Sequence, residues 1–229
     1  MTKGILYGVG VGPGDPELMT LKAQRVISEC PVLAVPKTKG QNNMALDIVS
    51  QVMDISDKEI IELDFLMIRD REQLARHHQA LADLLAPVLD AGKSIALLNI
   101  GDVSIFATYS YIRDEVASRG YDTVSVAGVP SFCAVAATLG VSLTKANLPL
   151  HIIPAGYPCT ADALDLPGSK VLMKAGSTLA TLKETLRQKE LSGQTSLVEN
   201  CGLETQAVYH QIEDAPDDTG YFATIVVRA

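Results

Sequence analysis

Apolar residues in the first 140 positions form short blocks that alternate with longer segments of helical spacing. The blocks predict strands at residues 5–9, 32–35, 59–65, 94–100 and 123–127. Helices are expected between them, at about 16–28, 45–53, 70–88 and 105–118. This alternation indicates an α/β fold, with a mainly parallel five-stranded sheet that carries helices on both faces.

Two of these helices carry signals for their ends. Asp15 is expected to cap a helix whose first residue is Pro16, because proline at that position loses no hydrogen bond. Asp70 is followed three residues later by Gln73, which resembles a capping box. Pro87 is expected to kink or shorten the end of that second helix.

The last 80 residues have a different pattern. Strands are expected at 150–155, 170–175, 196–200, 207–212 and 221–227, with a short helix after the first and a longer one at 178–190. The last two strands are separated by an acidic loop and are expected to pair antiparallel, which makes the second sheet mixed. A polar, proline-containing stretch at 141–149 places the domain boundary there, giving domains 1–143 and 144–229.

Charge and composition restrict the range of functions that the chain can have. The chain has 19 basic and 27 acidic residues, a net charge of −8. This argues against nucleic acid or an anionic membrane as the main partner, because both require a basic surface. The four cysteines form no CxxC pair, the four histidines are scattered, and no apolar run is long enough to span a membrane. We expect a cytoplasmic protein without a protein-bound metal.

The run GVGVGPGDPELMT (8–20) follows the first predicted strand. A dinucleotide-binding fingerprint needs G-x-G-x-x-G, but its third glycine falls on Pro13 or Asp15, depending on the register. A P-loop needs Lys followed by Ser or Thr, and Asp15-Pro16 stands there instead. The run predicts a tight turn whose backbone comes close to another group. The alternative is that its glycines only supply positive φ angles.

Similar small-residue loops follow four other predicted strands, at NIGDVSIF (99–106), AGVPSF (127–132), VLMKAG (171–176) and VENCG (198–202). In open α/β sheets, ligands bind at the carboxyl ends of strands. Each loop by itself is weak support, because such turn sequences are common.

In this order and spacing, the loops resemble the tetrapyrrole methylase family over essentially the whole chain. The match is most specific at VGVGPGDPELMTLKA (9–23), and the GDVSIF loop carries Val103 in place of the usual proline. The segments AGVPSFCAVAA (127–137), FLMIRDRE (65–72) and VENCG are similar to members that methylate carbon 20 of precorrin-2 or cobalt-factor II.

The resemblance implies two α/β domains, a homodimer, and S-adenosylmethionine bound in the cleft between the domains beside the tetrapyrrole. Matching positions assign cofactor contacts to Pro13, Ile100, Gly101, Asp102, Ile105, Pro130, Ser131, Met173, Cys201 and Thr224. Candidate substrate contacts are Gly12, Gly14, Asp15, Lys37, Lys39, Arg69 and Arg71. The four cations would meet substrate carboxylates, and the alternative is that they are solvated loop charges.

Asp102 is the candidate catalytic group, either orienting the methyl donor or accepting the proton lost afterwards. The alternative is a structural role, in which Asp102 caps the helix expected near Ile105. The catalytic role and the capping role are compatible. Alternatives for the whole chain are a tetrapyrrole methylase with another target carbon, a nucleotide-dependent oxidoreductase, or a non-catalytic module on the same fold.

Overall fold

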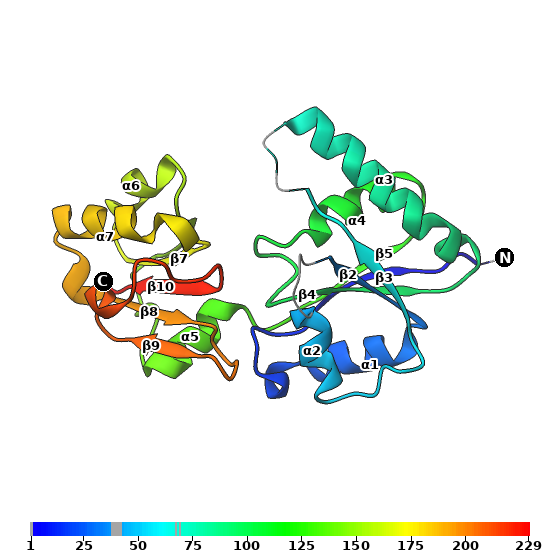
Figure 1. The fold of residues 1–229 in the computed structure, drawn as a ribbon, viewed down its shortest axis with the longest axis horizontal. Helices are drawn as coiled ribbons and strands as arrows, with labels where there is room; N and C mark the ends of the chain where they lie inside the picture. The colour runs from blue at the N-terminus through cyan, green and yellow to red at the C-terminus, as the bar shows by residue number, and fades with distance from the viewer. Residues whose placement is uncertain (1, 38–42, 67, 69) are drawn as a thin grey trace. The chain divides into compact units, whose positions relative to one another are not determined.

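A computed structural model describes residues 2–37, 43–66, 68 and 70–229 (Figure 1). The described residues divide into two compact units, one ending at Pro130 and the other spanning Ser131–Ala229. The division falls earlier than the boundary expected at 143/144. The physical reason is that helix α5 (Ser131–Leu139) packs on strands β8 and β10 of the second unit.

The first unit is built on a five-stranded sheet in which all strands are parallel. Its strands are β1 (Leu6–Gly10), β2 (Val32–Pro36), β3 (Glu59–Leu63), β4 (Ile95–Asn99) and β5 (Thr123–Val126). They lie in the order β3-β2-β4-β1-β5. The prediction of five parallel strands is therefore confirmed. Strand β4 is buried at all five positions, as a central strand covered on both faces should be.

Helices cover both faces of this sheet. Helices α1 (Leu21–Glu29) and α2 (Met44–Ser50) lie on one face, and α3 (Arg71–Asp90) and α4 (Tyr109–Ser118) lie on the other (Figure 1). Alternate strand residues serve the two cores: Leu33 packs with α1 and α2, whereas Val32 packs with α3 and α4.

Two expected helix starts are wrong. Asp15 does accept a hydrogen bond from the Glu17 amide, at 2.8 Å, but it caps only a 3₁₀ turn, η1 (Pro16–Leu18). Helix α1 begins later, because the Thr20 hydroxyl accepts from the Ala23 amide and provides the cap. Helix α4 begins at Tyr109 and not near Ile105.

The end signals of α3 have a mixed outcome. Asp70 caps the helix as expected, since one carboxylate oxygen accepts from the amides of Glu72 and Gln73, each at 3.0 Å. Pro87 lies inside the helix, which continues to Asp90, so the proline does not shorten it.

The second unit contains a mixed sheet. Its strands are β6 (Leu150–Pro154), β7 (Ser169–Met173), β8 (Thr195–Glu199), β9 (Ala207–Tyr209) and β10 (Ala223–Val227), in the order β6-β7-β10-β8-β9. Strands β6 and β7 are parallel and the other pairs antiparallel. The expected pairing of the last two strands is wrong. Strand β10 is buried at all five positions and takes the centre, while β9, with Val208 exposed, lies at the edge.

Helices also cover the second sheet. Helices α6 (Cys159–Leu164) and α7 (Leu179–Gln188) lie on one face and α5 on the other (Figure 1). Three 3₁₀ turns complete the unit: η2 (Gly176–Thr178), η3 (Ser192–Gln194) and η4 (Ile212–Asp214). Across the described ranges of both units, no helix has the length and apolarity needed to cross a membrane.

A candidate ligand site at the strand ends

Three loops of the first unit meet where β1, β4 and β5 end. The amide of Gly101 donates to the Gly12 carbonyl at 2.7 Å, and the amide of Gly12 donates back to the Gly101 carbonyl at 3.4 Å. The amide of Val11 donates to the Asn99 carbonyl at 2.9 Å. The β1–β4 pairing thus continues as a short bridge beyond both strands and holds their loops together.

Glycine is required here mainly because the main chains touch. A Cβ on Gly10 would lie 2.6 Å from the Gly101 carbonyl oxygen and 2.7 Å from the Gly128 nitrogen, and a Cβ on Gly128 would overlap that same oxygen. Positive φ is a second requirement, at Gly12 (82°) and Gly101 (74°). Both interpretations of the glycine run therefore apply, at different residues.

Gly8, at the start of the run, has another purpose. It lies under the ring of Tyr109, which a Cβ at this position would overlap. Tyr109 is 1% exposed and packs in the core beneath α4. This glycine therefore serves helix packing.

Asp102 ties two of the loops together through its carboxylate. One oxygen accepts from the amide of Ser104 at 2.8 Å and from the Ser104 hydroxyl, and the other accepts from the amide of Gly128 at 2.8 Å. Burial acts to raise the pKa of this carboxyl group, but the three hydrogen bonds outweigh burial and hold the pKa below its ordinary value.

This geometry decides between two of the sequence hypotheses for Asp102. It does not cap a helix near Ile105, because α4 begins at Tyr109 and its N-cap Thr108 makes no side-chain cap bond. The carboxylate instead holds the loop after β4 against the loop after β5. A group already accepting three hydrogen bonds, with a lowered pKa, is a weak base.

In the second unit, three of the expected contact residues come together. Met173, at the end of β7, is paired in register with Thr224 on β10. The Thr224 hydroxyl lies 3.3 Å from the hydroxyl of Ser131, the first residue of α5. Cys201 follows β8, and its sulfur lies 3.5 Å from the Thr138 hydroxyl of α5. The loops after β7 and β8 turn sharply, with Lys174 and Asn200 in the left-handed region.

The remaining candidates of the first unit fall into two groups. Gly12, Pro13 and Gly14 are buried, and Ile100, Ile105 and Pro130 are half-buried, all in the loops after β1, β4 and β5. Lys37 and Arg71 are exposed, after β2 and at the start of α3. The Lys37 amide donates to the Leu63 carbonyl at 2.7 Å, which places it at the end of β3 as well. Lys39 and Arg69 lie outside the described residues.

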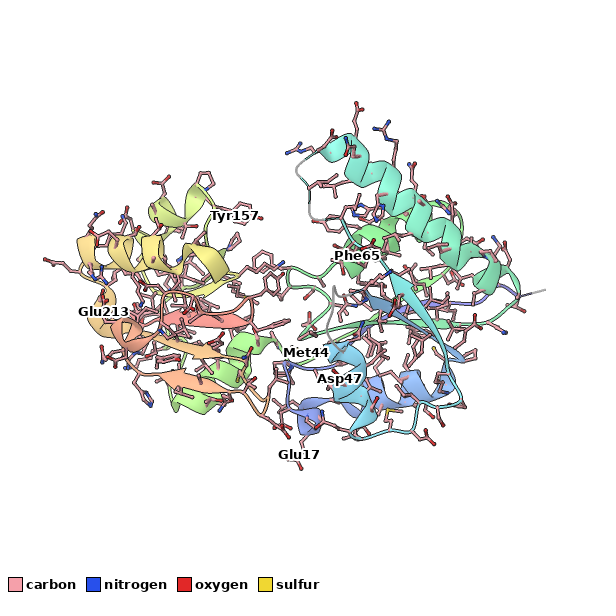
Figure 2. The ribbon with its side chains drawn as sticks, viewed as in Figure 1. Glu17, Met44, Asp47, Phe65, Tyr157 and Glu213 are labelled. Carbon is pink, nitrogen blue, oxygen red and sulfur yellow. The ribbon has the colours of Figure 1, made fainter. Side chains whose placement is uncertain are left out.

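Aromatic side chains beside the second-unit strand ends did not emerge from the sequence. Tyr221 and Phe222 precede β10 and contact each other edge to face, with ring centroids 5.3 Å apart. The Lys174 ammonium lies 5.9 Å from the Tyr221 ring centroid. Tyr157 projects from the loop between β6 and α6 (Figure 2) and is 60% exposed. The available signal was the concentration of these rings near strand ends in a chain that is only 5% aromatic.

Metal ligation finds no support in this geometry. Within the described ranges, no three His, Cys, Asp or Glu side chains are grouped so that they could hold a metal ion.

Comparison with known proteins identifies relatives over most of the chain. The model of the family described as Tetrapyrrole (Corrin/Porphyrin) Methylases matches residues 5–216. A probable cobalt-precorrin-2 C(20)-methyltransferase of Methanocaldococcus jannaschii is 36% identical over 152 residues, which cover 66% of this chain and 64% of the relative. The cobalt-precorrin-2 C(20)-methyltransferase of Salmonella typhimurium is 28% identical over 230 residues, covering 98% of this chain and 96% of the relative.

Solved structures share the fold. A cobalt precorrin-4 methyltransferase of cobalamin biosynthesis superposes with a TM-score of 0.75 at 17% identity, covering 98% of this chain and 94% of the other. The uroporphyrin-III C-methyltransferase of Thermus thermophilus, complexed with S-adenosyl homocysteine, has a TM-score of 0.72 at 21% identity and covers 98% and 92%. The α/β fold with two sheets expected from the sequence is confirmed.

We expect Asp102→Asn to lower the free energy of unfolding by about 1–3 kcal/mol, because an amide cannot accept from both Ser104 and Gly128. The lowered pKa means that the carboxylate stabilises the native state above the unfolded pKa of about 3.9, and that this contribution disappears as the pH falls through the folded pKa. Urea titrations from pH 7 to pH 3 should show the gap between wild type and variant closing in acid.

The matched control is Asp54→Asn. Asp54 is exposed and accepts from the amide of Ser56 at 3.0 Å in a similar local turn, with no long-range partner among the residues that the structure describes. Its substitution should have a much smaller effect. Equal losses for the two variants, or a gap that is independent of pH, would show that Asp102 does not hold the loops.

Proposed function

The chain belongs to the tetrapyrrole methylase family, and on that premise we propose that it transfers a methyl group from S-adenosylmethionine to carbon 20 of precorrin-2 or its cobalt-containing form. The observation that carries the proposal is alignment over 98% of the chain with a cobalt-precorrin-2 C(20)-methyltransferase. A cobalt-precorrin-4 C(11)-methyltransferase of Methanocaldococcus jannaschii is 26% identical over 63% of this chain, so carbon 11 is the alternative target. No observation favours the oxidoreductase or the non-catalytic module.

The strand-end residues fit a methyl donor with a nucleoside and an amino-acid group. In the first unit, Gly10, Gly101 and Gly128 bring main chain to the surface of the loops without side-chain bulk. In the second unit, the hydroxyls of Ser131 and Thr224 can meet polar groups, and Met173 beside them supplies an apolar contact. We assign donor contacts to these residues, to the loops at Pro13 and Ile100–Ile105, to Pro130 and, at the end of β8, to Cys201.

Bound S-adenosylmethionine supplies a methyl group on a sulfonium, which is already activated for transfer. The chain therefore needs to orient the reactants and exclude water more than to provide acid or base. Asp102 suits this role, because its carboxylate fixes the loop from Gly101 to Ser104 against Gly128. We assign it a positioning role, and the proton lost from the methylated carbon leaves without this carboxylate as its acceptor.

The reaction product tests the proposed function directly. Purified protein supplied with ¹³C-methyl-labelled S-adenosylmethionine should add one methyl group at carbon 20, as located by NMR and mass spectrometry. Metal-free precorrin-2 and cobalt-factor II should be compared, since the protein residues do not distinguish them. A methyl group at carbon 11 of a later intermediate would support the alternative, and no methylated product from any of these tetrapyrroles would overturn the proposal.

Thr224→Val tests the donor contacts in the second unit. The substitution keeps the shape of the side chain and removes one hydroxyl, so affinity for S-adenosylmethionine should fall roughly 2- to 12-fold, equivalent to ~0.5–1.5 kcal/mol. The control is Thr195→Val, a buried threonine at the other end of the neighbouring strand β8. Calorimetry should find its affinity unchanged, and equal losses in both variants would remove Thr224 from the donor contacts.

Lys37 and Arg71 test how an acidic protein holds a substrate with several carboxylates. We propose that both contact those carboxylates, as do Lys39 and Arg69, which follow the same two predicted strands in the sequence. The double variant Lys37→Glu, Arg71→Glu should raise the tetrapyrrole KM strongly and leave the affinity for S-adenosylmethionine nearly unchanged. The effect should shrink with added salt, because exposed charges are screened over about 8 Å at physiological ionic strength.

The control for these charge reversals is Lys22→Glu with Arg113→Glu, two exposed cations on α1 and α4. This control variant changes the net charge by the same amount as the Lys37→Glu, Arg71→Glu variant, but on α1 and α4 of the first unit. Equal KM values for the two double variants would mean that Lys37 and Arg71 are solvated loop charges.

A further inference from the structure

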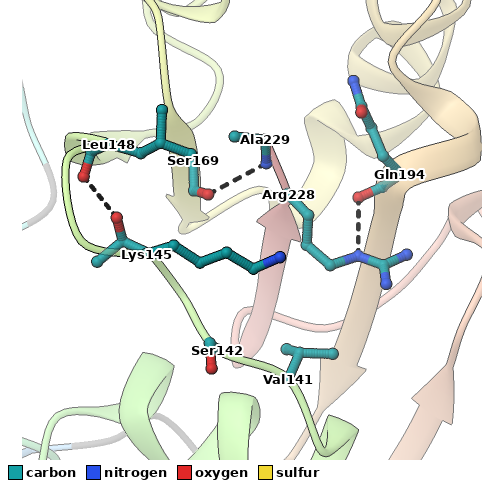
Figure 3. A pocket seen from close by; sticks show the side chains of 9 residues that line it. Val141, Ser142, Lys145, Leu148, Ser169, Gln194, Arg228 and Ala229 are labelled. Carbon is teal, nitrogen blue, oxygen red and sulfur yellow. Dashed lines mark hydrogen bonds between the residues drawn. The ribbon is translucent and has the colours of Figure 1, made fainter.

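A cavity lies in the second unit, at the strand ends opposite to those that carry Met173 and Thr224. This cavity of about 430 Å³ is bounded by the segment from Val141 to Leu148, by Ser169 at the start of β7, by Gln194 before β8, and by Arg228 after β10 (Figure 3). Its volume is within the range of small-molecule sites, about 300–1,000 Å³.

The cavity is separate from the donor contacts proposed above. Strand β7 runs from Ser169, in the cavity wall, to Met173. At about 3.3 Å per residue, these two ends lie roughly 13 Å apart. Strand β10 runs the other way, from Thr224 beside Met173 to the residue before Arg228. A ligand in the cavity therefore meets residues that the methylase site does not use.

Two cations line the cavity without an acidic side chain among its lining residues. The Lys145 side chain extends toward the Arg228 side chain, and the Arg228 guanidinium extends toward Gln194 (Figure 3). Among the described residues, no carboxylate lies within 4.0 Å of either one, and no Asp or Glu side chain lines the cavity. A free carboxyl group on Ala229, which also lines the cavity, would offset only one of the two charges.

Arg228 is held in place by hydrogen bonds that leave the two terminal amino groups of its side chain available to a ligand. Its amide donates to the Gln194 carbonyl at 3.0 Å, and its side-chain Nε lies 3.4 Å from the same oxygen. Its two terminal amino groups donate to none of the described residues, so they can donate to a ligand as a pair. A guanidinium with both of these groups available matches two oxygens of a phosphate or carboxylate.

The opposite wall is also fixed before any ligand binds. The Leu148 amide donates to the Lys145 carbonyl at 2.8 Å, and the Thr144 hydroxyl donates to the Leu148 carbonyl at 2.5 Å. The Ala229 amide donates to the Ser169 hydroxyl oxygen at 3.1 Å, closing the wall between β7 and β10. A preformed site loses little conformational entropy on binding.

We propose that this cavity binds a small phosphate-bearing molecule. Two cations that line one cavity without an acidic side chain attract an anion, and a dianion gains more from both of them than a monoanion does. Phosphate offers more negative charge and more acceptor oxygens than a single carboxylate, which suits the paired amino groups of Arg228 and the ammonium of Lys145. The cavity exceeds the size of phosphate alone, and Val141 and Leu148 provide an apolar wall for an attached organic group.

The test uses the full chain and inorganic phosphate as the first probe, in calorimetry at constant ionic strength maintained with chloride. Phosphate should bind to a single site, and Arg228→Gln or Lys145→Gln should weaken binding by roughly 10-fold or more. Arg228→Lys keeps the charge but removes the paired donors, so it should give an intermediate loss. Affinity for S-adenosylmethionine should remain at the wild-type value in all three, which also shows that they fold.

Lys22→Gln is the matched control, since it removes one exposed lysine charge from the first unit. It should leave phosphate binding unchanged. Citrate is the second probe, because a cavity that requires only negative charge would bind citrate as well as phosphate, whereas a phosphate site would bind phosphate more tightly. Three outcomes would each overturn the proposal. These are equal binding of citrate and phosphate, equal losses of phosphate binding in Lys22→Gln and Lys145→Gln, and no phosphate binding at a phosphate concentration 20-fold above about 1 mM.

Discussion

Contact between main chains at Gly10, Gly101 and Gly128 is the constraint on which the candidate site depends. Side-chain bulk at Gly10 or Gly128 would push apart the loops that follow β1, β4 and β5. Since glycines form few side-chain contacts, the loops need another source of cohesion. The Asp102 carboxylate supplies it by accepting from the amide of Gly128 while holding Ser104. Close approach and this one buried anion thus stabilise the same arrangement.

This construction has a chemical consequence. A surface made of main chain and anchored by a fully engaged carboxylate can bind and orient a ligand, but it is poorly suited to moving protons. Transfer of an already activated methyl group asks for orientation more than for acid–base power. The chemistry proposed for a tetrapyrrole methylase therefore agrees with what these loops can do physically.

Charge is distributed so that an acidic chain still offers local positive sites. With a net charge of −8, long-range attraction does not favour anions, so binding must come from cations placed individually. Lys37 and Arg71 are exposed near strand ends of the first unit, and Lys145 and Arg228 face a cavity of the second. The two pairs belong to separate units, and the ligands proposed for them are different.

The sequence by itself determined most of the elements and the family. Apolar blocks predicted all ten strands found in the described residues, because a strand in a covered sheet buries apolar residues whichever strand it pairs with. Local signals failed where a distant contact decided the outcome. Strand β10 lies between β7 and β8 because it is the strand buried throughout, and pairing depends on burial in the whole sheet rather than on chain order. The Asp102 carboxylate accepts a hydrogen bond from the amide of Gly128, which lies 26 residues later in the chain. Only the tertiary structure could show that contact, since neither residue carries a local sign of the other.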